Sequence, residues 1–184
     1  MKNCDRIILG IDPGTNIMGY GILEIQAKKP SCLVMDVIHL SKIKDPYLKL
    51  QKIFREIQVL IDRYHPDELA IEAPFFGKNV QSMLKLGRAQ GVAIAAALAR
   101  DIPVFEYAPR KIKMAITGQG AASKEQVAAI LSKILLIKEL PQDLDATDGL
   151  AVALCHYYQN RPVLNEKSYR GWEDFLRKNP DRVR

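Results

Sequence analysis

Residues 6–14 read Arg-Ile-Ile-Leu-Gly-Ile-Asp-Pro-Gly, and this stretch decides the fold class. A short, β-branched apolar run is typical of a strand that is buried on both faces, and the Pro-Gly pair after Asp12 predicts a turn. We therefore predict an α/β fold in which residues 6–12 form a central strand.

The pattern on either side of this strand predicts the other elements. Residues 46–64 have the apolar periodicity of an amphipathic helix, which Pro66 ends. We expect further strands at 17–25, 32–40, 68–72 and 103–107, and further helices at 79–100, 109–117, 123–136 and 143–160. This order predicts an antiparallel meander followed by βαβ crossovers, and so a five-stranded mixed sheet sandwiched between α-helices.

The composition is that of a globular protein, with 184 residues, 48% of them hydrophobic and 26% charged. Residues 161–184 differ, because they hold seven basic and four acidic residues and few aliphatic ones. We predict one domain over residues 1–160 and a basic C-terminal tail over 161–184. Three scattered cysteines argue against a disulfide framework or a zinc site, and no apolar run is long enough to span a membrane. We therefore expect a cytoplasmic protein without membrane partners.

Two acids end strands that we predict to be buried. Asp12 ends the run 6–12, and Glu72 ends the run 68–72. A carboxylate at the end of a buried strand is costly unless something compensates its charge. In sheets with crossover helices, ligand clefts also form at the carboxyl ends of the strands. Asp12 and Glu72 are therefore candidate site residues.

Two further acids, Asp145 and Asp148, lie three residues apart at the start of the last predicted helix. This spacing places both on one face of the helix, at the end where the helix dipole tolerates negative charge. If they converge with Asp12 and Glu72, the oxygen ligands suit a hard cation such as Mg²⁺ or Mn²⁺. Four carboxylates can hold two such ions, which together promote phosphodiester hydrolysis.

Each acid also has an ordinary explanation when it is taken alone. Asp12 before Pro-Gly is a common turn residue, and Glu72 could end a strand that faces water. Asp145 and Asp148 could be helix-capping acids. The functional interpretation rests on the set, which a mixed sheet could bring together from separate elements.

The order and spacing of four motifs resemble the RuvC family, the bacterial Holliday-junction resolvases of the RNase H-like fold. The motifs are IDPGT at 11–15, GYG at 19–21, Ile71-Glu72 followed by Phe75-Phe76, and DATDGLA at 145–151. The resemblance covers residues 6–160. Each motif is weak alone, and the ordered set is specific.

This resemblance implies a metal-dependent endodeoxyribonuclease with a five-stranded mixed sheet between helices. Asp12, Glu72, Asp145 and Asp148 match the four acidic residues of the family one for one, as catalytic and metal-binding residues. The implied substrate is a four-way DNA junction, nicked symmetrically on two opposed strands in recombination and repair. The implied cofactor is Mg²⁺, with two ions per active site and with Mn²⁺ able to substitute.

The resemblance also implies residues that contact DNA. Phe75 matches an aromatic residue that enters the junction centre, where it could stack on an unpaired base, although the adjacent Phe76 leaves the choice open. Lys113 and Lys124 match positions that contact the DNA backbone. They belong to a basic segment, 108–138, with six basic residues and one acid. Such residues neutralise phosphates, but a solvated helix face would have the same composition.

The resemblance further implies a homodimer, and by family alone a branch-migration helicase complex as a partner. Two cuts related by a two-fold axis need two acidic clusters, which is an independent reason to expect two copies. Small residues recur along 79–100, from Gly87 to Ala97, so this helix is our candidate for part of the interface. Ordinary packing on the sheet would explain the same residues.

Two other functions remain open from the sequence. Sugar kinases and actin-like ATPases have a first phosphate motif similar to Asp-x-Gly-Thr, as at Asp12 to Thr15 here. They also need a second, duplicated domain and a glycine-rich adenine site, and we find neither. An RNA-processing relative of RuvC is the other alternative, against which the pairing of Asp145 with Asp148 and the basic segment argue.

Overall fold

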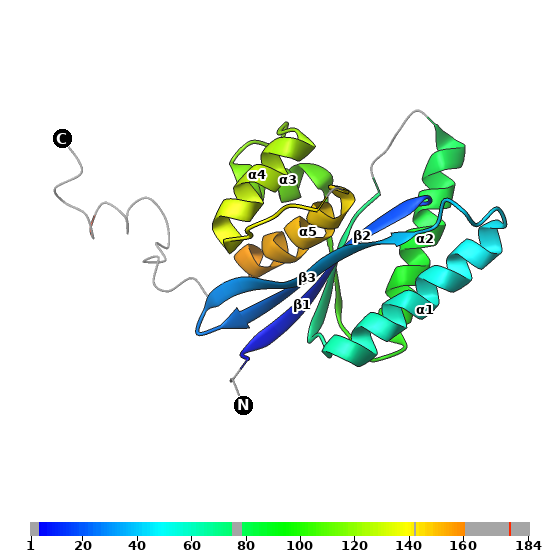
Figure 1. Ribbon diagram of the computed structural model, residues 1–184, viewed down its shortest axis with the longest axis horizontal. Coiled ribbons are helices and arrows are strands. Elements are labelled where there is room, and N and C mark those ends of the chain that lie inside the picture. The colour runs from blue at the N-terminus through cyan, green and yellow to red at the C-terminus, as the bar shows by residue number, and fades with distance from the viewer. Residues whose placement is uncertain (1–3, 75–78, 142, 161–176, 178–184) are drawn as a thin grey trace.

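The structure is a computed structural model, and it describes residues 4–74, 79–141, 143–160 and 177. It contains a five-stranded sheet in the order β3-β2-β1-β4-β5, with helices on both faces (Figure 1). The strands are β1 (Arg6–Asp12), β2 (Ile17–Gln26), β3 (Lys29–His39), β4 (Glu68–Glu72) and β5 (Val104–Tyr107). The helices are α1 (Pro46–Tyr64), α2 (Val80–Leu98), α3 (Pro109–Thr117), α4 (Lys124–Leu135) and α5 (Asp145–Gln159).

The sheet is mixed, as the sequence predicts. β1 pairs antiparallel with β2, and β2 with β3, whereas β4 is parallel to both β1 and β5. The central position of β1 explains its apolar sequence, because its alternate residues enter two different cores. Ile8 packs on the α5 side of the sheet, and Leu9 packs on the α1 and α2 side.

One element begins earlier than its sequence suggests. β3 begins at Lys29 and not at residue 32, because β2 and β3 are joined by a tight turn at Ala27 and Lys28. Both turn residues have positive φ, 49° and 62°, which is the conformation of a two-residue hairpin turn. Such turns usually contain glycine or asparagine, so an Ala-Lys pair gives little sign of one.

The two helical layers have different roles. α1 and α2 pack against each other and cover one face, while α5 lies along β1 and β2 on the other and is flanked by α3 and α4 (Figure 1). Most residues of α5 are buried. In the described part of the chain, no helix has the length and apolar character needed to cross a membrane.

Candidate active site

Asp12 and Glu72 lie side by side at the carboxyl ends of the neighbouring strands β1 and β4. The parallel ladder between β1 and β4 pairs Ile11 with Ile71, and each acid is the next residue of its strand. Ile8 and Ala70 belong to the core on the α5 side, and strand residues alternate in direction, so Asp12 and Glu72 also face α5.

α5 brings Asp145 and Asp148 to the same ends of β1 and β4, because its first turns contact the sheet through backbone atoms. A β-carbon on Gly149 would lie 2.5 Å from the Cα of Tyr20, a distance that real side chains do not tolerate. Any larger residue at this point would therefore push α5, and the two acids in its first turn, away from β2.

Three of the acids form a tight oxygen cluster. Carboxylate oxygens of Asp12, Asp145 and Asp148 lie within 4.8 Å of one another. Glu72 is not part of this closest group, but it lines a cavity of about 250 Å³ together with Asp12, Asp148, Lys113 and Lys124. The structure thus brings all four candidate acids to one site, and the distances suit oxygen ligation of a hard divalent cation.

Crowding of the acids changes their protonation. Burial, followed by repulsion from Glu72 and Asp148, raises the pKa of Asp12 to about 8. Burial and then repulsion from Asp148 raise the pKa of Glu72 to about 7. Burial also raises the pKa of Asp148, although Lys124 opposes the shift. A site that disfavours its own negative charges to this degree favours a bound cation.

Lys124 is the counter-ion of the two helical acids. Its Nζ lies 2.7 Å from Oδ1 of Asp145 and 2.8 Å from Oδ2 of Asp148. Burial alone would raise the pKa of Asp145, but the hydrogen bond and charge of Lys124, together with a hydrogen bond to Asp143, outweigh this effect and lower it. Burial likewise opposes the charge of Lys124, and the two carboxylates more than compensate, so that its pKa is raised. The ammonium group of Lys124 would therefore compete with a bound cation for the carboxylates of Asp145 and Asp148.

The capping explanation of Asp145 and Asp148 is wrong. The residue at the N-cap of α5 is Leu144, whose side chain makes no capping hydrogen bond, and the backbone nitrogen of Asp145 donates to Oδ1 of Asp143 at 3.4 Å. Both carboxylates contact Lys124 instead.

Gln90 is a site residue that the sequence analysis missed. Its side chain is nearly buried, and its Nε2 donates to the backbone oxygen of Glu72 at 3.3 Å and to Oε2 of Glu106 at 2.9 Å. It therefore ties α2 to the end of β4, immediately at Glu72. Gln90 is the single polar residue in the alanine-rich stretch 89–97 of this helix, and this was the available signal.

The structure describes only some of the residues that we predicted to contact DNA. Lys113 and Lys124 line the cavity that also holds Asp12, Glu72 and Asp148, so both belong to the site itself. Phe75 and Phe76 lie outside the described residues, and so does the predicted tail apart from Arg177.

Comparison with known proteins agrees with this geometry. The family model described as "Crossover junction endodeoxyribonuclease RuvC" matches residues 8–156. The chain belongs to the RuvC family. A RuvC from Cytophaga hutchinsonii is 62% identical over 183 residues, covering 100% of this chain and 90% of the relative. The Bacteroides fragilis RuvC is 61% identical over 183 residues, covering 98% of this chain and 97% of the relative.

Solved structures confirm the RNase H-like fold. The Thermus thermophilus RuvC in complex with Holliday junction substrate is 32% identical, with a TM-score of 0.76, and the match covers 84% of this chain and 94% of that one. The yeast mitochondrial Holliday junction resolvase Ydc2 has a TM-score of 0.60, with 82% and 77% covered, and at 14% identity it shows the fold alone. These matches give no support to the actin-like or RNA-processing alternatives.

Proposed function

We propose that this RuvC-family protein is an endodeoxyribonuclease that resolves four-way DNA junctions by paired nicks, as expected in recombination and repair. One observation carries the proposal. Asp12, Asp145 and Asp148 converge within 4.8 Å, beside Glu72, on a fold whose Thermus thermophilus representative was solved with Holliday junction substrate. Oxygen donors alone, brought together from β1, β4 and α5, suit a metal-dependent phosphodiesterase.

The donor set fits Mg²⁺, with Mn²⁺ as a substitute and two ions per site. Bound there, such ions would activate water and stabilise the leaving oxygen of a phosphodiester. The protein's own residues hold and orient the reacting groups. The carboxylates of Asp12 and Glu72 are held on strands, and the positive charge of Lys124 opposes the rise in the pKa of Asp12. Lys113 and Lys124 flank the cavity as cations that can neutralise DNA phosphates.

A homodimer through α2 would supply the second active site. Ala89, Ala93, Ala96 and Ala97 are buried toward α1 and the sheet, so the small residues partly serve internal packing. The opposite side of the helix exposes large apolar residues, with Val80 63%, Leu84 53% and Leu98 57% exposed.

Gly87 and Gly91 lie along this same exposed stripe, and a β-carbon on either would have no neighbour within 4 Å. Positions 80, 84, 87, 91 and 98 follow the spacing of a helix–helix seam. A second copy packed on this stripe would bury it around a two-fold axis.

The decisive test of function compares substrates. The protein is incubated with a synthetic four-way junction, a duplex, a single strand and an RNA–DNA hybrid, each with Mg²⁺ and with EDTA. We expect paired nicks in the junction alone and only with Mg²⁺. Cleavage of all substrates would indicate a general nuclease, and tight junction binding without cleavage in any divalent metal would indicate a binding protein. Either result would overturn the proposal.

A further inference from the structure

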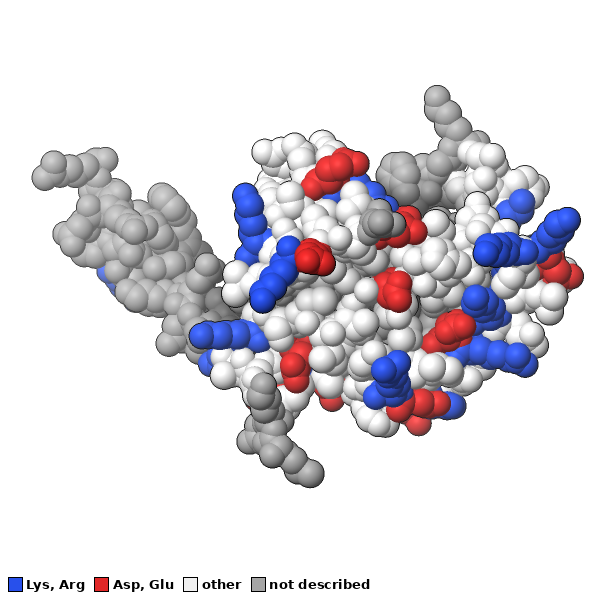
Figure 2. Space-filling view, viewed as in Figure 1, with Lys and Arg blue, Asp and Glu red and all other residues white. Residues whose placement is uncertain are grey.

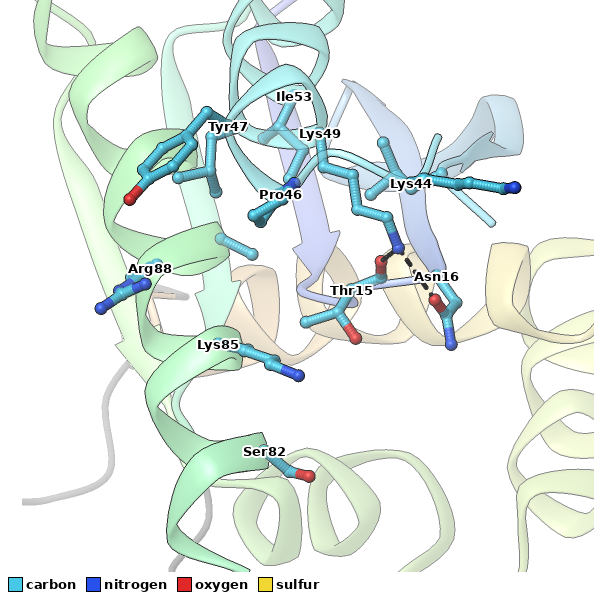
Figure 3. Close-up of a pocket in the computed structure, with 13 residues that line it drawn as sticks. Thr15, Asn16, Lys44, Pro46, Tyr47, Lys49, Ile53, Ser82, Lys85 and Arg88 are labelled. Carbon is cyan, nitrogen blue, oxygen red and sulfur yellow. Dashed lines mark hydrogen bonds between the residues drawn. The ribbon is translucent and has the colours of Figure 1, made fainter. Parts of the chain in front are cut away.

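A second hollow lies on the other face of the sheet, between α1, α2 and the loop that joins β1 to β2. Its volume is about 470 Å³. Figure 3 shows Lys85 of α2 pointing across it toward Thr15, with Ser82 on the same helix, and with Lys44 and Arg88 extending outward on opposite sides. This hollow is separate from the acidic cavity, with which it shares no lining residue.

The charge of the hollow is of one sign. Among the residues that the structure describes, no acid lines it and four basic residues do, namely Lys44, Lys49, Lys85 and Arg88. Lys49 is used internally, because its Nζ donates to the backbone oxygen of Thr15 at 2.8 Å and to Oδ1 of Asn16 at 3.0 Å. The other three form no ion pair with any residue that the structure describes. Figure 2 shows basic side chains gathered around the loop before α1.

Neutral hydrogen-bond donors complete the lining. The hydroxyl groups of Thr15 and Ser82 and the amide nitrogen of Asn16 have no hydrogen-bond partner among the described residues, and all three residues line the hollow. Unpaired cations together with hydroxyl and amide donors are the groups that proteins use to contact DNA phosphates. A metal ion would need carboxylates, and an apolar ligand would need a lining without this charge.

The hollow also lies close to the acidic cluster along the chain. Thr15 follows Asp12 by three residues, so the two Cα atoms are separated by at most about 11 Å. A DNA strand carries one phosphate about every 3.4 Å along the helix axis. If one phosphate of a strand lies at Asp12, a phosphate two or three positions further along the same strand can therefore reach Thr15 and its neighbours.

We propose that this hollow binds phosphodiester groups of the same DNA strand that is cut at the acidic cluster, with Lys85 as its principal cation and Thr15, Asn16 and Ser82 as donors. The proposal rests on the proposed function, because it takes the scissile phosphate to lie at Asp12. Lys49 serves it indirectly, by holding the 15–16 loop in place. The hollow would then orient the DNA strand as it enters the acidic cluster.

The first test measures junction binding in EDTA over a range of salt concentrations. Lys85→Gln is compared with Lys85→Arg, which keeps the charge, and with Lys29→Gln, which removes the same charge from an exposed residue at the far end of the sheet. We expect Lys85→Gln to weaken binding about three- to tenfold and to reduce the salt slope by about 0.9. Lys85→Arg and Lys29→Gln should keep the wild-type slope. An unchanged slope for Lys85→Gln would overturn the proposal.

The second test locates the contact on the strand. Single methylphosphonate linkages, which remove one phosphate charge, are placed at each of the four positions on either side of the scissile phosphate. We expect one or two positions to weaken wild-type binding and to have no further effect on Lys85→Gln, since both changes remove the same contact. Purely additive losses at every position would show that Lys85 does not contact this strand.

Two controls separate the possible sources of failure. Competition with inorganic phosphate and with dAMP at millimolar concentration tests whether the hollow is a site for free anions. If either abolishes the difference between wild type and Lys85→Gln, the hollow recognises the phosphate group through Lys85, as the proposal requires. If wild-type protein neither binds nor cuts the junction, the proposed function fails. If it does both and Lys85→Gln is indistinguishable from it, only this inference fails.

Discussion

A β-carbon on Gly19 would lie 1.8 Å from the backbone carbonyl oxygen of Asp145, so β2 and the first turn of α5 meet backbone to backbone. Gly19 is also the ladder partner of Asp12 in the β1–β2 pair. Together with Gly149, this residue without a side chain allows the acid at the end of β1 and the two acids of α5 to lie close together. The close approach of helix and sheet is what assembles the oxygen cluster.

Gly19→Ala should consequently damage both folding and the site. The added methyl group has no space that a side-chain rotation could provide, because its neighbour is backbone. We expect a loss of stability of about 3 kcal/mol or more, measured by urea unfolding. In whatever folded protein remains, Mg²⁺-dependent nicking should fall further than the folded fraction. Wild-type stability and activity in this variant would show that the contact is not required.

The raised pKa of Asp12 makes the metal-free protein sensitive to pH. In the folded protein this pKa is about 8, above its ordinary value of 3.8, so the contribution of Asp12 to stability is full below about pH 4 and is lost as the pH rises through 8. Asp12→Asn resembles the protonated acid. We expect the stability advantage of the variant over wild type in EDTA to be larger at pH 9 than at pH 5 by more than about 1.4 kcal/mol.

Mg²⁺ provides the control for this pH effect. A cation that compensates the carboxylates should restore the stability of the wild type at pH 9 and should do little for Asp12→Asn. A difference between the two proteins that stays constant from pH 5 to pH 9 in EDTA would contradict the assigned pKa shift.

The sequence predicted the carboxylates of the site better than their partners. Asp12 and Glu72 could be found because strand ends are visible as apolar runs that stop at an acid. The contact of Lys124 with Asp145 and Asp148 could not be found, because it joins elements 21 residues apart through a loop whose path no local pattern fixes. Lys124 was predicted only as a DNA contact, and this role stays a prediction.

The contacts of His156 are a second example of tertiary contacts that the local sequence pattern does not predict. His156 lies in α5 and is fully buried, and its Nε2 lies 2.6 Å from Oε2 of Glu68. Its Nδ1 lies 2.6 Å from the hydroxyl oxygen of Tyr107, and Arg6 completes the group. These partners come from β1, β4 and β5, and only the tertiary fold brings them together. The strand and helix positions themselves followed from periodicity, which acts over a few residues.

Lys124 and a bound cation should compete for Asp145 and Asp148. We expect Lys124→Gln to bind Mg²⁺ more tightly than wild type at pH 8.5, by about threefold or more, because the competing ammonium is gone. Isothermal titration calorimetry without DNA measures this directly. The same variant should bind junction DNA more weakly, with a salt slope reduced by about 0.9. Weaker Mg²⁺ binding would show that Lys124 supports the metal site and does not compete with it.

The exposed stripe on α2 should hold the dimer together. Leu84→Glu places a charge in the middle of the stripe, and we expect it to convert a dimer into a monomer in analytical ultracentrifugation. Val59→Glu is the matched control, since Val59 is 58% exposed on α1, outside the stripe. On a junction, the Leu84→Glu variant should give single, uncoupled nicks. If Leu84→Glu keeps the oligomeric state of the wild type, the interface lies elsewhere.

The central claim is that the four acids perform the cleavage, and paired nicking and gel-shift assays on a synthetic four-way junction with Mg²⁺ test it most directly. Asp12→Asn, Glu72→Gln and Asp148→Asn should each reduce nicking at least about a hundredfold while junction binding stays equal or becomes tighter, because a negative charge near phosphates has been removed. Asp145→Asn tests the remaining acid in the same way. Full cleavage by the first three variants would contradict the account.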